Sequence, residues 1–429
     1  MKSLFKRIVV AILTFEAKFL LQRTKPQIIA ITGSVGKTSI KDAVYEVFKG
    51  RVHVRKSEKS FNSELGVPLS VLGLPNAWNN PFHWLKNIFD GAMLAIHPGE
   101  YPKLLVLEMG VDRPGDMDKL TAWIKPDVVI LTRLPDVPVH VEFFDSPEAV
   151  IEEKKKLVQA LKPEGVLVFN QDDERAVQVA AETRQQSIGY SRYSLSPFTA
   201  SADRIVYEDG RAIGFEFMLT HVDRAVVFRV NGTLGVQQAY NYAAAAAVAS
   251  VFQITLDEVA DALRSFVPPP GRMRLIPGIK DTILIDDTYN SSPAASEQSL
   301  KTLGEMKGVK RRIAVLGDMM ELGQFSTKEH ERIGMMVPRY ADKLVTIGVR
   351  ARGFSAGARA AGMDERNMLE FSDALEAGRE LQTLIKPGDV LLVKGSQSVR
   401  AERFVEELMS DPQDAEELLV RQDPVWKQK

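Results

Sequence analysis

The segment from residue 28 to residue 48 restricts the fold of this chain more than any other. A short apolar run, Ile28–Ile31, leads into the turn Thr-Gly-Ser-Val-Gly-Lys-Thr at residues 32–38. Apolar side chains then recur at helical spacing up to Phe48, which predicts a helix with one buried face. A buried strand, a glycine-bearing turn and an amphipathic helix in this order are typical of α/β proteins that bind phosphate groups.

The chemistry of the turn favours the phosphate chain of a nucleotide. Gly33 and Gly36 allow backbone N–H groups to close around phosphate oxygens, and the ammonium of Lys37 can neutralise their charge. A threonine hydroxyl at position 38 suits Mg²⁺. Ile31 stands where the general pattern has its first glycine, and an ordinary strand–helix turn is the weaker alternative. The residues expected to contact the phosphates are Gly33, Ser34, Gly36, Lys37, Thr38 and Ser39.

Apolar runs and helical patterns alternate along the first part of the chain. The runs that predict buried strands of a mostly parallel sheet are Ile28–Ile31, Leu104–Leu107, Val128–Leu131 and Val166–Phe169. Between residues 205 and 230 the pattern changes to a small antiparallel excursion, and helices are expected at 239–252 and 256–266. The prolines at 268–270 cannot continue a helix, so a domain boundary is expected there.

Strand and helix patterns restart after the prolines. The expected strands are Thr282–Ile285, Ile313–Leu316, Leu344–Ile347 and Val390–Val393. The sequence therefore predicts an α/β fold class, with a central domain that carries the phosphate loop on a mostly parallel sheet and a C-terminal Rossmann-like α/β domain. The expected domains are an amphipathic N-terminal helix at residues 1–25, the central domain at 26–267 and the C-terminal domain at 268–429.

Two apolar stripes stand apart from these domains. The first stripe is formed by Leu4, Ile8, Ile12, Phe15 and Phe19. It lies in a basic segment that lacks a cleavage site and whose apolar run is too short to span a bilayer. We expect a helix packed on the protein body, with a membrane-surface helix as the alternative. The second stripe, beside Trp84, is formed by Trp78, Phe82, Leu85, Phe89 and Met93. Core or interdomain packing is expected for it, and a lipid-facing or substrate-facing surface is the alternative.

The composition excludes several classes of function. The 429 residues carry a net charge of −1, so nucleic acid is not an expected partner. The absence of cysteine excludes disulfides, thiolate metal sites and a cysteine nucleophile. With 45% hydrophobic residues, the chain can form two or three domains with substantial cores.

Several motifs resemble those of the Mur ligases, a family of ATP-dependent enzymes that form amide bonds. The compact loop at residues 32–38 is typical of that family, and Phe61–Pro68 resembles its Asn-Asn-x-x-Gly-Val-Pro segment. His140–Ser146 is similar to its His-Leu-Glu-x-Phe-Gly-Ser motif. The resemblance implies a carbamylated lysine at position 154, with Lys155 and Lys156 as alternatives for the register. The metal ligands implied are Thr38, Glu108, His140 and Lys154, and the catalytic groups are Lys37, His140 and Lys154.

The resemblance continues through the rest of the chain. Asn170–Asp173 resembles the family's Asn-x-Asp-Asp turn, and Gln237 stands where a histidine is common. Leu316–Gly323, followed by His330, is characteristic of the branch that adds a dipeptide, and Gln397 replaces an arginine usual after Lys-Gly-Ser. The nucleotide contacts implied are Asn241, Arg272, Asp286, Tyr289 and Asn290. The substrate contacts implied are Asn62, Asp318, Glu321, Lys394 and Ser396.

The resemblance implies a cytoplasmic, monomeric ligase that uses ATP and Mg²⁺ to join D-alanyl-D-alanine to a muramyl-peptide precursor through an acyl phosphate. About 25 residues precede the loop, so the family's separate uridine-binding domain is not expected in this chain. One alternative is a related ligase that acts on a lipid-linked or other carboxylate, and another is a non-catalytic nucleotide-binding scaffold. A peripheral membrane contact through residues 1–25 is a further alternative partner.

Overall fold

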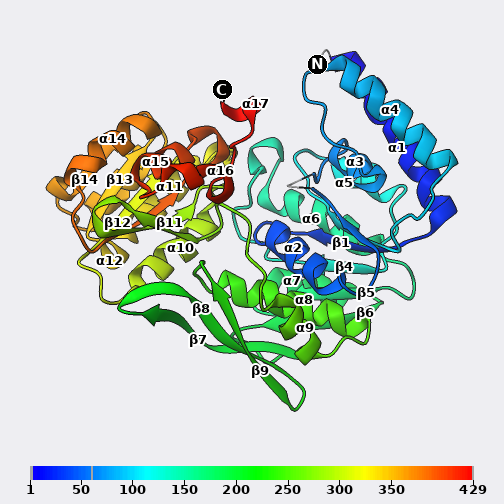
Figure 1. The fold of residues 1–429 in the computed structure, drawn as a ribbon, viewed down its shortest axis with the longest axis horizontal. Coiled ribbons are helices and arrows are strands. Elements are labelled where there is room, and N and C mark those ends of the chain that lie inside the picture. The colour runs from blue at the N-terminus through cyan, green and yellow to red at the C-terminus, as the bar shows by residue number, and fades with distance from the viewer. Residues whose placement is uncertain (1–2, 59–60, 428–429) are drawn as a thin grey trace.

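The protein, represented by a computed structural model, folds into two lobes built on two sheets. The structure describes residues 3–58 and 61–427, so the first two residues of the expected N-terminal helix lie outside it. The sheets have nine and six strands, and Figure 1 shows the lobe with β10–β15 beside the lobe with β1–β6. The α/β fold class predicted from the sequence is confirmed.

The first sheet has the strand order β2-β3-β1-β4-β5-β6-β7-β8-β9. Its strands are β1 Gln27–Thr32, β2 Val54–Lys56, β3 Leu104–Glu108, β4 Val128–Leu131, β5 Val166–Asn170, β6 Gln186–Ser191, β7 Phe198–Glu208, β8 Arg211–His221 and β9 Arg224–Asn231. Neighbouring strands are parallel from β2 to β7. Because parallel strands end at one edge, the loops after β1 and β3 lie together there.

Helices cover both faces of this sheet. One face carries α2 Lys37–Phe48, α8 Gln237–Val251 and α9 Leu256–Leu263. The other carries α1 Ser3–Thr24, α3 Gly66–Leu72, α4 Pro81–Ile96, α5 Asp116–Thr121, α6 Pro147–Gln159 and α7 Glu174–Glu182, with the 3-10 turn η1 Val141–Phe143. Alternate residues of β1 enter the two cores, since Ile29 and Ile31 belong to the cluster on the α2 side whereas Ile28 and Ala30 belong to the cluster on the α1 side.

The second sheet has the order β10-β11-β15-β12-β13-β14, and only β10 is antiparallel to its neighbour. Its strands are β10 Arg274–Gly278, β11 Thr282–Asp287, β12 Arg311–Gly317, β13 Lys343–Ile347, β14 Met368–Phe371 and β15 Asp389–Lys394. The helices are α10 Pro293–Glu305, α11 Ser326–Gly334, α12 Val337–Tyr340, α13 Arg352–Ala360, α14 Ala374–Leu384, α15 Glu402–Leu408, α16 Ala415–Leu418 and α17 Pro424–Lys427. The 3-10 turns are η2 Ile279–Asp281, η3 Gly323–Phe325, η4 Glu365–Asn367, η5 Gln397–Val399 and η6 Pro412–Asp414.

The antiparallel region is larger than the small excursion expected from the sequence. β7 and β8 each contain 11 residues and extend the main sheet through the β6–β7 pair. Charged pairs on the exposed side, such as Arg204 with Glu216, interrupt the apolar pattern and hide the full length of these strands. The helix expected to reach residue 266 ends at Leu263.

Helix α1 packs on the lobe, as expected, but through a different face from the apolar stripe seen in the sequence. Val9, Leu13 and Leu20 are buried, whereas Leu4 and Phe15 of the stripe are 69% and 70% exposed. Both sides of this helix are apolar, so helical spacing could not distinguish the packed side from the exposed one.

Helix α4 also exposes the stripe for which core or interdomain packing was expected. Phe82 and Phe89 are 77% and 65% exposed, whereas Trp84 beside them is buried. The indole N–H of Trp84 donates to the carbonyl oxygen of Trp78 at 2.9 Å, which fixes the start of the helix. Across residues 3–58 and 61–427, no helix is long and apolar enough to cross a bilayer.

The buried Glu16 of α1 predicts a pH-dependent stability. Its Oε2 has no hydrogen-bond partner, and burial raises the pKa of this carboxyl from 4.5 to about 7. The unfolded chain ionises first as pH rises, so the free energy of unfolding falls between these two values. We expect Glu16→Gln to raise the free energy of unfolding by about 1–3 kcal/mol near pH 8 and far less near pH 5. Urea denaturation at both pH values measures this difference, and equal effects would contradict it.

Candidate active site

The loop between β1 and α2 has a backbone that requires glycine at two positions. Gly33 and Gly36 have φ angles of +131° and +89°, and a Cβ on Gly33 would lie 2.0 Å from Oγ1 of Thr132. The N–H of Ser34 donates to the carbonyl oxygen of Arg133 at 2.9 Å, which ties the loop to the end of β4. Helix α2 therefore begins at the carboxyl edge of the sheet, where its positive dipole end can receive an anion.

Lys37 is folded back over this loop. Its Nζ donates to the carbonyl oxygen of Gly33 at 2.9 Å. Burial lowers the pKa of this ammonium, and the carboxylate of Glu108 opposes that shift. A phosphate group beside Lys37 would add negative charge and favour the charged form, which is what a phosphate-binding lysine requires.

Oxygen ligands suited to Mg²⁺ lie beside the loop. The hydroxyl of Thr38 donates to Oε2 of Glu108 at 2.8 Å, and Nδ2 of Asn62 donates to Oε1 of Glu108 at 3.0 Å. Mg²⁺ is commonly held by one or two protein oxygens together with water and substrate phosphates. Thr38 and Glu108 fit that role. Among the described residues no three His, Asp or Glu side chains form a metal cluster.

The side chain of Lys154 points at the same loop from helix α6. Its Nζ donates to the hydroxyl of Ser34 at 2.9 Å. Burial, together with the nearby charge of Lys37, lowers the pKa of Lys154 well below its usual value. By contrast, Lys155 pairs with Glu182 and Lys156 with Asp118 on the helix surface. Of the three adjacent lysines, Lys154 is the one the structure places against the phosphate loop.

His140 connects the two lobes. Its Nδ1 lies 2.8 Å from Oε2 of Glu321, and its Nε2 lies 3.5 Å from Oδ1 of Asp112. The pairing lowers the pKa of Glu321. His140, which was expected to bind metal, and Glu321, which was expected to bind substrate, are thus in direct contact across the cleft.

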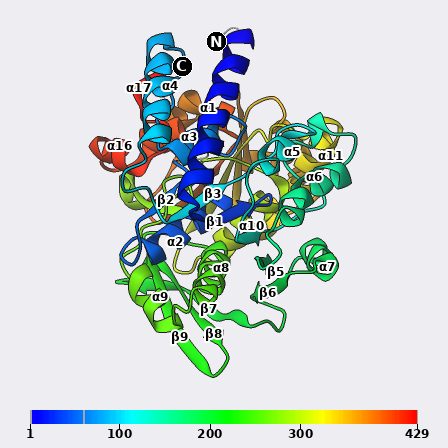
Figure 2. The same cartoon turned by 90° about the vertical axis from the view of Figure 1, so that its right-hand side faces the viewer.

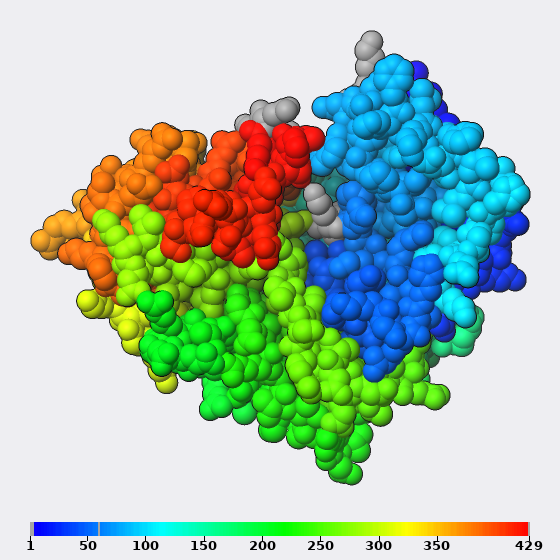
Figure 3. All heavy atoms as spheres, viewed as in Figure 1, coloured from blue at the N-terminus to red at the C-terminus, as the bar shows by residue number. Residues whose placement is uncertain are grey.

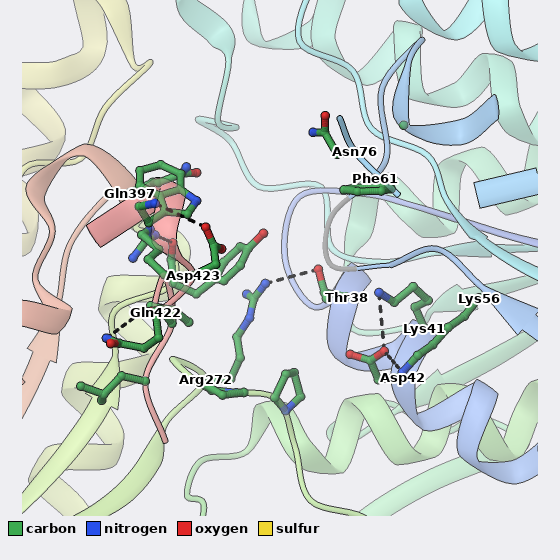
Figure 4. A pocket seen from close by; sticks show the side chains of 18 of the residues that line it. Thr38, Lys41, Asp42, Lys56, Phe61, Asn76, Arg272, Gln397, Gln422 and Asp423 are labelled. Atoms are coloured by element: carbon green, nitrogen blue, oxygen red, sulfur yellow. Dashed lines mark hydrogen bonds and ion pairs between the residues drawn. The ribbon is translucent and has the colours of Figure 1, made fainter. Parts of the chain in front are cut away.

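The chain crosses between the lobes at residues 268–273, and Arg272 reaches back toward the phosphate loop. Its Nη2 donates to Oγ1 of Thr38 at 3.3 Å, as Figure 4 shows, and its guanidinium lies 4.0 Å from the ring centre of Tyr289. Asp286 is buried behind this joint. Its carboxylate accepts the backbone N–H groups of Gly271 and Thr288, both at 3.1 Å, so it holds the joint and does not face the cleft.

The geometry at Arg272 predicts that lysine cannot replace it. Arg272→Lys would remove the planar stacking on Tyr289 and the reach to Thr38. We expect kcat/KM for ATP to fall about 10- to 100-fold, which corresponds to the loss of one stacked, hydrogen-bonded cation. Steady-state kinetics test this, with the exposed Arg264→Lys as the matched control. A variant with wild-type kinetics would show that Arg272 does not contact the nucleotide.

The second lobe contributes a buried ion pair at the end of β15. Nζ of Lys394 donates to Oδ2 of Asp287 at 2.7 Å and to the carbonyl oxygen of Asn290 at 2.9 Å. Asp318 and Ser396 have structural partners, because they accept the N–H groups of Ala351 and Met320 at 2.7 and 2.9 Å.

Next to Asn241 on α8 lies a pocket whose aromatic lining the sequence did not reveal. The cavity of about 210 Å³ is lined in part by Tyr190, Tyr193 and Tyr240. The hydroxyl of Tyr240 donates to Asp172 at 2.8 Å, and burial raises its pKa. In the sequence, the Asn170–Asp173 turn and Asn241 pointed to this site, since Asp172 and Asn241 both line the pocket.

Two cavities meet where the lobes face each other, and Figure 3 shows the surface hollowed between them. One, of about 310 Å³, contains most of the expected site residues; it is lined by Ser34, Gly36, Lys37, Thr38, Ser39, Asn62, Glu108, His140, Asn241, Arg272, Tyr289, Asn290 and Lys394, among others. Lys154 and Glu321 lie just behind it, bonded to Ser34 and His140. A larger cavity of about 660 Å³ continues from Thr38 and Arg272 toward Phe61 and Trp78. The C-terminal segment closes its far side, where Arg421, a residue the sequence did not single out, donates to the backbone of Thr288 at 3.0 Å.

The fold and the site together define a two-lobed α/β protein in which the glycine-bearing loop after β1 faces the second lobe across a cavity. A model of the Mur ligase middle domain matches residues 31–249, and a model of the Mur ligase glutamate ligase domain matches residues 271–397. The chain belongs to the Mur ligase family.

Several proteins resemble this chain over most of its length. The UDP-N-acetylmuramoyl-tripeptide–D-alanyl-D-alanine ligase of Bacillus subtilis is 27% identical over 402 residues, covering 92% of this chain and 79% of that protein. The ligase of the same name from Mycobacterium leprae is 31% identical, covering 90% and 74%. The crystal structure of MurF ligase from Thermotoga maritima in complex with ADP aligns with a TM-score of 0.75 at 26% identity, covering 93% and 83%.

Proposed function

We propose that this chain is an ATP-dependent ligase that adds D-alanyl-D-alanine to a UDP-N-acetylmuramoyl-tripeptide in peptidoglycan synthesis. The observation that carries the proposal is the cavity in which the phosphate loop of one lobe faces Arg272 and Lys394 of the other. The names of the relatives from Bacillus subtilis and Mycobacterium leprae state the same two substrates.

The reaction has two steps, in which the protein supplies charge and alignment more than a nucleophile. In the first step an oxygen of the acceptor carboxylate bonds to the γ-phosphorus of ATP, and the bond to ADP breaks. In the second step the amine nitrogen bonds to the acyl carbon, phosphate leaves, and the amine gives up a proton.

The residues around the cavity have distinct roles in this reaction. Lys37 and the first backbone N–H groups of α2 bind the β- and γ-phosphates, and Arg272 aligns them from the second lobe. Asn241 contacts the base beside the tyrosine-lined pocket. Thr38 and Glu108 would hold Mg²⁺, and the ion would supply positive charge that neutralises the phosphates when it is bound.

Lys154 serves as a carbamate. An amine whose pKa is lowered by burial is uncharged more often, and an uncharged amine can attack carbon dioxide. The new N–C bond and the loss of a proton convert a cation into an anionic oxygen ligand beside Ser34 and the metal oxygens. This change would also remove the repulsion between Lys154 and Lys37.

Residues 268–271 act as the hinge between a central domain at 26–267 and a C-terminal domain at 268–429. Asp286 anchors the hinge through Gly271, while the contact of His140 with Glu321 stabilises the closed arrangement. Closure excludes water, which would otherwise hydrolyse the acyl phosphate.

A product assay tests the proposal. The chain is incubated with ATP, Mg²⁺, D-alanyl-D-alanine and UDP-N-acetylmuramoyl-tripeptide, and the products are identified by mass spectrometry. We expect a pentapeptide product together with ADP and phosphate, dependent on both substrates. ATP hydrolysis that is the same with and without D-alanyl-D-alanine, and no ligated product, would contradict the proposal.

A further inference from the structure

The exposed apolar stripes of α1 and α4 lie side by side on the same side of the first lobe. The α1–α4 face is formed by Leu4, Ile8, Phe15, Phe19, Phe82, Leu85, Phe89, Met93 and Ile96, all exposed. The opposite sides of both helices bury residues such as Leu13 and Trp84 in one hydrophobic cluster, so both stripes point away from it. Figures 1 and 2 show the two helices adjacent in both views.

Contacts between the helices fix their relative direction. The guanidinium of Arg23 donates to the carbonyl oxygens of Ala95 and Ile96 at 2.9 and 2.6 Å, and Glu16 lies against Gly91. The helices therefore run roughly parallel, with their C-terminal ends together. With 22 and 16 residues, they extend this apolar surface over roughly 24–33 Å.

Positive charge borders the α1–α4 face. Arg7 and Lys18 of α1 and Lys86 of α4 are exposed. Of the carboxylates in the described part of these helices, Glu16 is buried and Asp90 pairs with Lys86. The border of the face therefore attracts anions, whereas a second copy of the face would present the same cations to it.

We propose that the α1–α4 face binds the surface of a bilayer that contains anionic lipids. Large apolar side chains flanked by cations are the features of helices that lie in the plane of a membrane interface. Neither helix is long and apolar enough to cross the bilayer. Trp78, directly before α4, also lines the large cavity, so the bound membrane would lie close to the cavity that leads to Thr38.

Vesicle sedimentation with the full chain tests the proposal. The lipids are equal parts of phosphatidylglycerol and phosphatidylcholine, with pure phosphatidylcholine in parallel. We expect sedimentation with the anionic vesicles, weaker at high salt. The double variant Phe15→Gln/Phe89→Gln should lower the partition coefficient at least about tenfold through lost apolar burial. Arg7→Gln/Lys18→Gln should lower it by a similar factor on anionic vesicles only. The exposed Val227→Gln on β9 is the matched control and should bind as the wild type does.

The outcomes are separable from those of the proposed function, because this binding needs neither ATP nor ligation. Circular dichroism confirms that each variant is folded, and ligation of a soluble acceptor should be unchanged in Phe15→Gln/Phe89→Gln. A wild-type chain that stays in the supernatant, or a double variant that sediments equally well, would overturn the proposal. A concentration-dependent dimer that this variant dissociates, without vesicle binding, would assign the face to a second copy instead.

Discussion

Lys37→Ala is expected to abolish ligation, with kcat/KM reduced by about three orders of magnitude, and to leave the fold intact. The substitution removes the ammonium that is folded back over the phosphate loop, at 2.9 Å from the carbonyl oxygen of Gly33. Since phosphoryl transfer depends on neutralising charge, no neighbouring group can replace it fully. Product formation measured by chromatography, together with the thermal unfolding midpoint, tests both parts of this expectation.

Lys49, at the other end of helix α2, provides the matched control. It is exposed and pairs with Glu46 on its own helix, so Lys49→Ala should ligate at the wild-type rate. Ligation near wild-type rates in Lys37→Ala would rule out the assignment of this loop to ATP.

Lys154→Ala is expected to lower kcat at least about 100-fold, and a short carboxylic acid such as acetate should restore part of the activity. The substitution removes the buried side chain beside Ser34 and leaves a space that a small carboxylate can occupy. Rescue by acetate distinguishes a lost anionic oxygen ligand from simple loss of packing. Chloride is the comparison, because it is an anion that lacks the two oxygens. Activity is measured with and without added acid at fixed pH.

The neighbouring lysines are the controls for the assignment of the carbamate to position 154. Lys155 and Lys156 form ion pairs with Glu182 and Asp118, so their alanine variants should be nearly unaffected in activity. Loss of activity in either one, with Lys154→Ala unaffected, would show that the register from His140 is wrong.

The central strands were the most predictable part of the fold. Parallel strands covered on both faces are continuous apolar runs, and Leu104–Glu108 and Asp389–Lys394 contain the runs expected there. Edge strands such as Val54–Lys56 and Met368–Phe371 carry polar residues on the solvent side and gave no comparable signal. Position in the sheet, which only the tertiary fold determines, accounts for this difference.

Motifs located the site but not the direction of every side chain in it. Asp286 and Asp287 are adjacent in β11, so their side chains point to opposite faces of the sheet. The motif could not show that Asp287 meets Lys394 while Asp286 turns to the hinge. Tyr190 and Tyr240 come from separate elements and converge only after folding, so no local pattern could place them in one pocket.

The exposed apolar stripes of α1 and α4 show a different limit of prediction from the sequence. Helical spacing identifies an apolar side but not whether protein covers it, and α1 and α4 have apolar residues on both sides. The packed sides contain small residues, such as Ala17 and Gly91, that allow close approach. Removing α1 would expose the core it covers, so point substitutions on its outer side test its function better than truncation.

The central claim is that this chain activates a carboxylate with ATP before an amine attacks it. The most direct measurement uses an acceptor in which both oxygens of the terminal carboxylate are a heavy isotope, with ATP, Mg²⁺ and D-alanyl-D-alanine. An acyl phosphate requires that one labelled oxygen leave with the phosphate, so mass spectrometry should find one heavy oxygen in each phosphate released. Ligated product together with unlabelled phosphate would contradict the account.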